Sequence, residues 1–466
     1  MIRNPQSDIR NPSPNMYPTF ATDLDAYRNS TMRILTLLST TLLLTFVACN
    51  PRVGNESPAR DAAADQPGAV CDADDGGITL APGFCAAVFA DGLGRARHIA
   101  AAPNGDLFVA IANQQAQPGG ILALRDTTGD GKADVTARFG DNGGTGIALH
   151  GGSLYFATDA EVLRYPLTAG ELRPSGAPDT IVAGLPNDRN HRAKETAFGA
   201  DGALYVNIGA PTNSCQVADR QSGSPGQDPC PDLETRAGIW RFDATRKGQT
   251  QANGTRYATG LRNVVALAFD ASGQTLYGAQ HGRDQLYQNW PGSYTEQQSA
   301  EQPSEELFRI NQGSDFGWPY CYHDNALGMK VLAPEYGGDG RTEGRCASKG
   351  APIMAFPGHW APNGLLFYSG SAFPARYRAG AFIAFHGSWN RAPLPQAGYK
   401  VVFVPFADGN PTGGYEVFAD GFAGADSIAA PNQARYRPMG LAHASDGSLY
   451  ISDTEKGRVW RVMWRR

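Results

Sequence analysis

A short pattern recurs six times along this chain, and it constrains the fold more than any other feature of the sequence. Each copy is a turn containing glycine, followed by a short strand in which apolar and aromatic residues alternate. The copies fall at residues 104–110, 152–158, 201–207, 272–278, 363–368 and 446–452. A series of short units with the same strand chemistry predicts a repeat protein built from β-structure.

A second strand usually follows each copy and an apolar strand often precedes it, so one unit is a β-meander. A meander cannot bury both of its faces alone, whereas six of them bury their faces by packing radially. We therefore predict an all-β, six-bladed β-propeller over residues 76–466, with a β-sandwich as the alternative. The first three copies lie about 48 residues apart and the later ones roughly 70–90, which predicts inserted loops and a site on one face.

The N-terminal segment is typical of an export signal. Met32 and Arg33 precede an uncharged run at 34–48, which is too short to span a bilayer comfortably. The run ends before Cys49 in a sequence that resembles a bacterial lipobox. We expect residues 1–48 to be an upstream extension plus a signal peptide, and residues 49–75 to be a lipidated cysteine and a flexible tether. The protein would then be anchored on the periplasmic face; a cleaved signal peptide without lipid is the alternative.

Charge and cysteine content narrow the possible partners. The chain has 40 Lys and Arg against 45 Asp and Glu, so we expect no nucleic acid partner and no membrane contact except the lipid on Cys49. Six further cysteines in an exported chain predict disulfides. Because the cysteines cluster in sequence, the expected pairs are Cys71–Cys85, Cys215–Cys230 and Cys321–Cys346.

Basic residues and one histidine occupy loops that lead into strands. His191 precedes a strand of the third unit, where an imidazole can take a proton from a substrate hydroxyl near neutral pH; a surface histidine is the alternative. Arg262 and Asn263 precede another strand, and Arg435 and Arg437 precede the last. If these loops converge, the guanidinium groups can bind planar carboxylates; otherwise they are solvated charges.

Two segments are candidates for calcium. Residues 126–134 place oxygen ligands at positions 1, 3, 5 and 9 with glycine at position 6, as in an EF-hand loop, but the acid of position 12 is missing. A structural calcium site and a plain acidic turn both remain open there. The second segment, residues 281–284, offers backbone carbonyls in a sharp turn. The candidate ligands of the first segment are Asp126, Thr128, Asp130, Lys132 and Asp134.

Five segments in order resemble the glucose/sorbosone dehydrogenase family, the soluble quinoprotein sugar dehydrogenases. They are residues 181–191, 257–263, 314–319, 359–364 and 435–437, and the resemblance runs from about residue 82 to the C-terminus. The resemblance implies a six-bladed propeller that binds pyrroloquinoline quinone (PQQ) and Ca²⁺ in a basic pocket on its top face.

The resemblance also implies roles for particular residues. His191 would be the base for the sugar hydroxyl, Arg262 and Asn263 would polarise a quinone carbonyl, and Arg435 and Arg437 would hold the quinone carboxylates. Calcium would activate the quinone as a Lewis acid. Its ligands would come from the turn formed by Gly282, Arg283 and Asp284.

The chain departs from the glucose-oxidising branch of that family. Gly144 lies near the expected position of a sugar-contacting glutamine, and Arg391 is our substitute for a lysine that pairs with the cofactor. Arg283 replaces the usual proline of the calcium turn, which a carbonyl ligand tolerates. His359 and Trp360, the expected substrate contacts, look more like the sorbosone and pyranose dehydrogenase branches.

We therefore expect PQQ-dependent oxidation of a sugar, whether an aldose, a pyranose or a sorbosone-type aldehyde. The sequence has no Cys-x-x-Cys-His motif for haem, so the electrons would pass to an external acceptor, a cytochrome or a quinone. One alternative is a metal-dependent sugar lactonase, which would need carboxylate and Asn ligands in the channel. The other is a lipid-anchored, non-catalytic carbohydrate-binding propeller, against which the set of His191, Arg262 and Arg435 argues.

Overall fold

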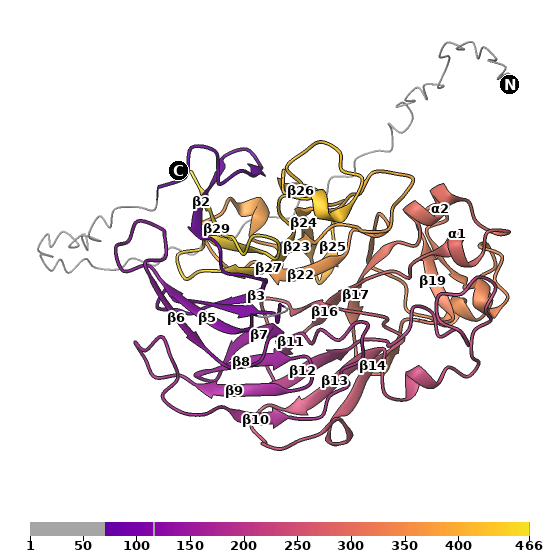
Figure 1. Cartoon of the computed structure of the whole chain (residues 1–466), viewed down its shortest axis with the longest axis horizontal. Coiled ribbons are helices and arrows are strands. Elements are labelled where there is room, and N and C mark those ends of the chain that lie inside the picture. The colour runs from indigo at the N-terminus through magenta and orange to yellow at the C-terminus, as the bar shows by residue number, and fades with distance from the viewer. Residues whose placement is uncertain (1–69, 115–116, 466) are drawn as a thin grey trace, which may run out of the picture. The chain divides into compact units, whose positions relative to one another are not determined.

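The computed structural model describes residues 70–114 and 117–465, and these form the expected six-bladed β-propeller (Figure 1). Each blade is built on an antiparallel meander of strands. The expected signal segment 1–48, Cys49 and the tether up to residue 69 lie outside the described residues.

The first three blades follow one another along the chain. Blade 1 contains β3 (Ala96–Ala101), β4 (Leu107–Ile111), β5 (Gly120–Arg125) and β6 (Val135–Phe139). Blade 2 contains β7 (Gly144–His150), β8 (Ser153–Thr158), β9 (Val162–Pro166) and β10 (Asp179–Val182). Blade 3 contains β11 (Thr196–Phe198), β12 (Ala203–Ile208), β13 (Gly238–Asp243) and β14 (Thr255–Thr259), with the short β18 (Ser314–Asp315) parallel to β14.

The last three blades contain longer connections and strands from the start of the domain. Blade 4 contains β15 (Ala266–Phe269), β16 (Leu276–Gln280), β17 (Glu305–Ile310) and β21 (Met354–Phe356). Blade 5 contains β22 (Pro362–Phe367), β23 (Gly380–Phe385), β24 (Lys400–Ala407), β25 (Asn410–Pro411), β26 (Glu416–Asp420) and β1 (Thr79–Leu80). Blade 6 contains β27 (Pro438–His443), β28 (Leu449–Asp453), β29 (Val459–Trp464) and β2 (Phe84–Ala90).

The ring closes between the two ends of the domain. β2 pairs with β29 and so becomes the outermost strand of blade 6. The innermost strands contact one another around the axis in the order β3, β7, β11, β15, β22, β27 and back to β3. A closed ring of this kind removes the open sheet edges of two stacked sheets, so the β-sandwich alternative is wrong.

The recurring sequence pattern has a structural basis. In five copies the turn glycine has positive φ, and the next strand is the second strand of its blade. All residues of β4, β12, β16 and β28 are buried, since each of these strands lies between neighbouring blades. The copy at 363–368 differs, because it lies on the innermost strand β22, where Gly364 closely approaches the carbonyl of Met439 in blade 6.

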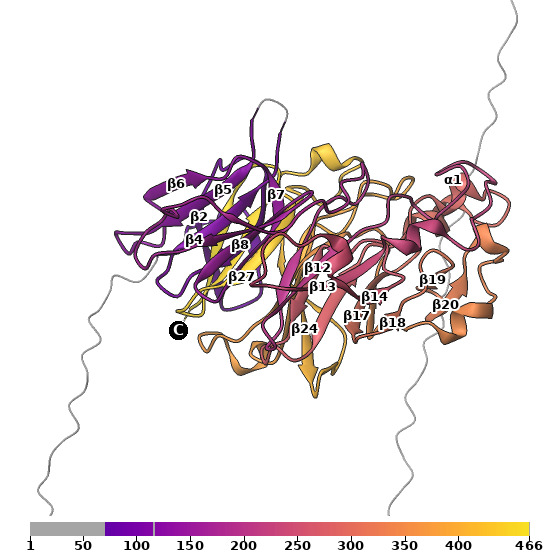
Figure 2. The ribbon, with the colours of Figure 1, turned by 90° about the horizontal axis from the view of Figure 1, so that it is seen from below.

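Long insertions follow β12, β16 and β17, and those after β16 and β17 lie together at one side of the ring (Figures 1 and 2). They contain α1 (Leu286–Asn289), α2 (Glu296–Glu301) and the hairpin of β19 (Cys321–Asp324) and β20 (Met329–Leu332). No helix of the described ranges is long and apolar enough to cross a membrane. Short 3₁₀ helices span Pro231–Glu234, Gln251–Asn253, Pro334–Tyr336, Gly344–Ser348, Ala375–Tyr377 and Pro431–Gln433.

All three expected disulfides are confirmed. Cys71–Cys85, Cys215–Cys230 and Cys321–Cys346 have Cα–Cα distances of 5.9, 6.1 and 5.7 Å. The first bond ties the start of the domain to β2, where Asp72 also accepts a hydrogen bond from the Val88 amide at 2.7 Å. The expected domain boundary at residue 76 therefore falls inside a segment that is already attached to the propeller.

Candidate active site

A cavity of about 300 Å³ lies where the innermost strands begin, and loops from five blades line it. A cavity of this size suits a small ligand. Blade 1 contributes Arg95, Arg97, Ala112 and Asn113; blade 2 contributes Gly143, Gly144, Thr145 and Asp159; the loop before β11 contributes His191, Arg192 and Ala193; blades 4 and 5 contribute Asn263, Val265, His281 and Asn363.

His191, the expected base, lines this cavity. Its backbone has positive φ, and it packs so closely on Gly209 that a Cβ there would lie 2.6 Å from the Cβ of His191. Its Nδ1 lies 2.6 Å from the carbonyl oxygen of Ala210, which can only accept, so Nδ1 carries the proton and Nε2 keeps its lone pair. Burial, reinforced by the positive charge of Arg262, holds the pKa of His191 well below 6.5. The ring is therefore a neutral base at physiological pH.

A second neutral imidazole stands in the same cavity. His281 Nε2 lies 3.0 Å from the carbonyl oxygen of Pro362 and 2.9 Å from Oδ1 of Asn363. Burial and the nearby Arg262 lower the pKa of His281 to about 4. The backbone amide of His281 donates to the carbonyl of Asn263, and the buried Oδ1 of Asn263 has no hydrogen-bond partner among the described residues. Asn263 thus lines the cavity, while its unpartnered Oδ1 is buried on the side of Gly209, where a Cβ would lie 3.3 Å from it.

Arg262 lies behind the cavity and is buried. Its guanidinium donates to Oδ2 of Asp284 at 2.8 Å and to the carbonyl of Gly282 at 2.9 Å. Burial alone would raise the pKa of Asp284, but the charges of Arg262 and Arg220 outweigh it and hold that pKa well below its usual range. The structure therefore joins Arg262 to the turn expected to bind calcium, and both lie beside His191.

Arginines give the cavity a positive wall. Arg95 and Arg97 line it from the start of β3, and Arg192 lines it from the loop that carries His191. Asp159 is the one acidic residue among the lining residues, and it is paired with Arg192 at 3.1 Å. Burial and the charge of Arg95 lower the pKa of Arg97 to about 10, so its side chain stays charged at neutral pH. The cavity is therefore suited to an anionic ligand.

The two arginines of the last segment point in different directions. Arg437 donates to the carbonyls of His386 and Gly387, at 3.0 and 2.7 Å, and lies close enough to lower the pKa of Arg97. Arg435 is exposed; its guanidinium lies over the ring of Tyr436, and a Cβ on Gly77 would lie 3.2 Å from its Nη1. Arg437 thus lies near the arginines of the cavity without lining it, and Arg435 lies on the surface.

The remaining expected cofactor and substrate residues stand apart from the cavity lining. Arg391 donates to the carbonyls of Ala300 and Gly358, and so supports the insertion. His359 is buried, donates to the carbonyl of Ser299 and has its Nδ1 4.0 Å from Asp284. Trp360 packs edge-on against Phe385 and Tyr415 between strands, so its ring fills core space instead of the cavity.

The loop at residues 126–134 bonds to itself. Asp126 accepts hydrogen bonds from the amides of Gly129 and Gly131 at 2.7 and 2.8 Å, and Asp134 accepts from the hydroxyl of Thr127 at 2.8 Å. In the described ranges the one cluster with metal-ligand spacing is Cys215, Cys230 and Asp232, and its cysteines form a disulfide. Thr128, Asp130 and Lys132 make short-range contacts within the loop or with Asp72. The structural calcium site and the plain acidic turn both stay predictions for this loop.

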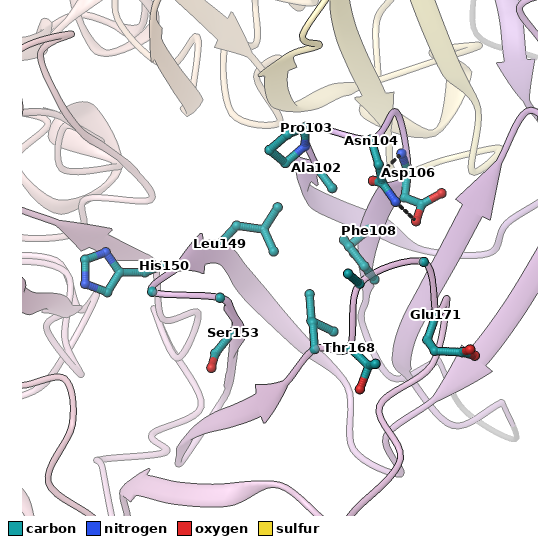
Figure 3. A pocket seen from close by; sticks show the side chains of 15 residues that line it. Ala102, Pro103, Asn104, Asp106, Phe108, Leu149, His150, Ser153, Thr168 and Glu171 are labelled. Atoms are coloured by element: carbon teal, nitrogen blue, oxygen red, sulfur yellow. Dashed lines mark hydrogen bonds between the residues drawn. The ribbon is translucent and has the colours of Figure 1, made fainter.

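A larger cavity of about 450 Å³ lies at the opposite ends of β3 and β7 (Figure 3). Turns at 102–106 and 149–153 and the segment 167–171 form it, and its walls are mainly apolar. Asp106 on its rim is already bound by Arg125 at 2.6 Å and by Asn104 at 2.9 Å. None of the expected site residues lines this cavity, so the chemistry points to the one that contains His191.

Comparison with known proteins places the chain in a family. Residues 78–465 match the TrAA12-like family, and the chain belongs to it. In fold it is similar to the calcium structure of the Trichoderma reesei carbohydrate-active enzyme of family AA12, with a TM-score of 0.67 and 20% identity over 83% of this chain and 97% of that one. The holo form of the pyranose dehydrogenase PQQ domain from Coprinopsis cinerea gives the same TM-score, identity and coverage.

Curated relatives match shorter parts of the chain. The PQQ-dependent pyranose dehydrogenase of Coprinopsis cinerea is 26% identical over 275 residues, 52% of this chain and 36% of that protein. An uncharacterized protein of Borreliella burgdorferi is 29% identical over 214 residues, 45% of this chain and 48% of that protein. The chain thus spans about half or less of the curated relatives that it matches.

Proposed function

We propose that this protein oxidises a sugar with PQQ as the electron acceptor in its active site. The observation that carries the proposal is the cavity in which the neutral His191, with Nε2 free, faces a wall of arginines. The similarity to the PQQ-dependent pyranose dehydrogenase of Coprinopsis cinerea supports it. His191 and Asn263 lie in the cavity, and Arg262 lies directly behind it.

The residues of the cavity fit PQQ, a planar quinone that carries several carboxylates. Arg95 and Arg97 supply positive charge at the wall, with Arg437 close behind them. Guanidinium groups bind carboxylates through paired hydrogen bonds. Asn263 lines the cavity, and its amide NH₂ group could donate a hydrogen bond to a carbonyl of the ligand.

The chain's own residues explain how the substrate would be activated. Nε2 of His191 would accept the proton of a sugar hydroxyl, while the Ala210 carbonyl keeps the opposite ring nitrogen protonated and the ring in place. Bound PQQ supplies a two-electron acceptor for the substrate carbon. Positive charge from Arg262 disfavours an imidazolium, which keeps His191 ready to act as a base.

The turn at Gly282–Asp284 is our proposed site for Ca²⁺. Calcium prefers hard oxygen ligands, and the turn offers backbone carbonyls beside two buried carboxyl groups, Asp284 and Glu305. Glu305 accepts a hydrogen bond from the Gly282 amide at 3.0 Å. The Gly282 carbonyl already accepts from Arg262 but has a second lone pair. A cation held here would act as a Lewis acid next to Arg262.

We further propose export to the periplasmic face, attachment through a lipid on Cys49, and electron transfer to an external cytochrome or quinone. The segment from Met32 to Cys49 supports the export signal. The three disulfides of the propeller are consistent with an oxidising compartment.

The binding of PQQ to the purified full-length apoprotein tests the proposal. Titration in the presence of Ca²⁺, followed by tryptophan fluorescence and equilibrium dialysis, should give saturable binding of one equivalent. Absence of binding would overturn the proposal. Hydrolysis of sugar lactones by the metal-loaded apoprotein would favour the lactonase alternative, whereas sugar binding without PQQ binding would favour the non-catalytic one.

A further inference from the structure

Asn213 is a buried residue that lies outside the cavity and yet contacts the machinery behind it. It stands in the insertion between β12 and β13 and has no exposed surface. Its side-chain Oδ1 accepts hydrogen bonds from Nη2 of Arg262 at 3.0 Å and from the amide of Asp284 at 2.9 Å. Its Nδ2 donates to the carbonyl of Asp284 at 2.9 Å. One amide group thus joins the guanidinium and the turn.

The backbone of Asn213 adds to the same connection. Its carbonyl accepts from Nε of Arg262 at 3.1 Å and from the indole of Trp318 at 3.0 Å. A buried cation needs acceptors for its N–H groups, and Arg262 finds them on Asn213, Asp284 and Gly282. The orientation of Arg262 is therefore fixed by a neighbouring insertion as well as by its own blade.

That insertion is itself held firmly. Cys215, two residues further along, forms the disulfide with Cys230. The amide of Asn213 donates to Oδ1 of Asp219 at 2.9 Å, and the hydroxyl of Thr212 donates to Asp232 at 2.6 Å. The disulfide and these hydrogen bonds therefore restrain the loop that places Asn213 against Arg262.

We propose that Asn213 is a positioning residue for the PQQ site, which sets the orientation of Arg262 and of the Gly282–Asp284 turn. This rests on the proposed function. Displacement of binding groups by about 1 Å can cost on the order of a hundredfold in an active site. Asn213 would act through Arg262 and the turn, without touching substrate.

The test measures PQQ affinity in the full-length apoprotein, with Ca²⁺ present, by fluorescence titration. Asn213→Ala should weaken binding roughly tenfold to a hundredfold, the effect of losing a hydrogen bond to a charged group. Asn213→Asp keeps the oxygen acceptors and loses the donor, so its affinity should fall between those of Asn213→Ala and the wild type. The matched control is Asn289→Ala, because Asn289 is buried in the neighbouring insertion and its Nδ2 has no partner among the described residues.

The outcomes separate the two proposals. Wild-type binding with equal affinity in Asn213→Ala, or an equal loss in Asn289→Ala, overturns the role of Asn213. Failure of the wild type to bind PQQ overturns the proposed function instead. If Asn213→Ala shows no cooperative thermal unfolding, Asn213→Asp decides the question, and a wild-type affinity in that variant contradicts the proposal.

Discussion

Nδ1 of His191 lies 2.6 Å from the carbonyl oxygen of Ala210, and this contact decides which ring nitrogen can accept a proton. Because the carbonyl only accepts, the lone pair is left on Nε2. His191→Ala should therefore retain PQQ binding and lose roughly 10²–10⁴ in kcat. Steady-state kinetics with titrated cofactor checks this. The control is His150→Ala, which should keep wild-type kcat. His150 is the last residue of β7, whereas the first residue of that strand, Gly144, lines the cavity.

The low pKa of His191 predicts that activity is lost only at low pH. A base works in its deprotonated form, and burial together with Arg262 holds the pKa of this imidazole well below 6.5. The ring gains a proton, and activity falls, only when the pH drops through that depressed value. The acid limb of kcat/KM should lie clearly below pH 6.5 and be absent in His191→Ala at its residual rate. An acid limb at or above pH 6.5 contradicts this assignment.

Arg437 and Arg435 should behave differently when each is replaced by Ala. The charge of Arg437 acts on Arg97, which lines the cavity, so the loss of Arg437 removes positive charge that would attract an anionic cofactor. PQQ affinity should fall by about tenfold or more, as for other charge-assisted hydrogen bonds. The exposed Arg435 packs on Tyr436. Because a solvent-exposed charge contributes little, its loss should change PQQ affinity by less than about threefold. An equal loss of PQQ affinity in the two variants would contradict this account and indicate that Arg435 also contributes to PQQ binding.

The Cys215–Cys230 disulfide should stabilise the insertion that carries Asn213. It spans 15 residues, and a loop of that length is worth roughly 3 kcal/mol in the chain-entropy account. The double variant Cys215→Ser/Cys230→Ser should unfold at a lower urea concentration and bind PQQ more weakly. Denaturant titration with a parallel PQQ titration measures both effects. Unchanged affinity in a destabilised variant would show that the disulfide serves stability alone.

Lipid attachment is tested by Cys49→Ser. If Cys49 carries the anchor, the variant should move from the membrane fraction to the soluble fraction of the expressing cells, with its PQQ-binding propeller intact. Immunoblots of the two fractions measure the distribution. A wild-type protein that is already soluble would support a cleaved signal peptide without lipid.

The sequence predicted the propeller because each blade repeats the same requirements. A turn glycine such as Gly105 must adopt positive φ, and the strand after it must be apolar on both sides because neighbouring blades cover it. The disulfides followed from cysteine clusters in an exported chain. The copy at 363–368 shows the limit of the pattern, because the same pattern of residues there forms the innermost strand β22 instead of the second strand of the blade.

The site was predicted in part. His191 and Asn263 lie in the cavity, with Arg262 behind it, whereas Arg95 and Arg97 were missed. A signal for them was present, because the pattern Arg-x-Arg occurs where an innermost strand begins, both at 95–97 and at 435–437. The side chains of Arg435 and Arg437 point in different directions, and the ring of Trp360 packs in the core. Tertiary packing sets these side-chain directions, and the spacing of residues in the sequence does not encode them.

The reduction of bound PQQ by sugar tests the central claim most directly. The full-length apoprotein would be loaded with PQQ and Ca²⁺, freed of excess cofactor, and mixed without oxygen with a panel of aldoses and pyranoses while the absorption spectrum is recorded. The account predicts that at least one sugar bleaches the oxidised quinone spectrum in the wild type and that His191→Ala slows this bleaching by roughly 10²–10⁴. Bound PQQ that no sugar bleaches, or bleaching at the wild-type rate in His191→Ala, would contradict it.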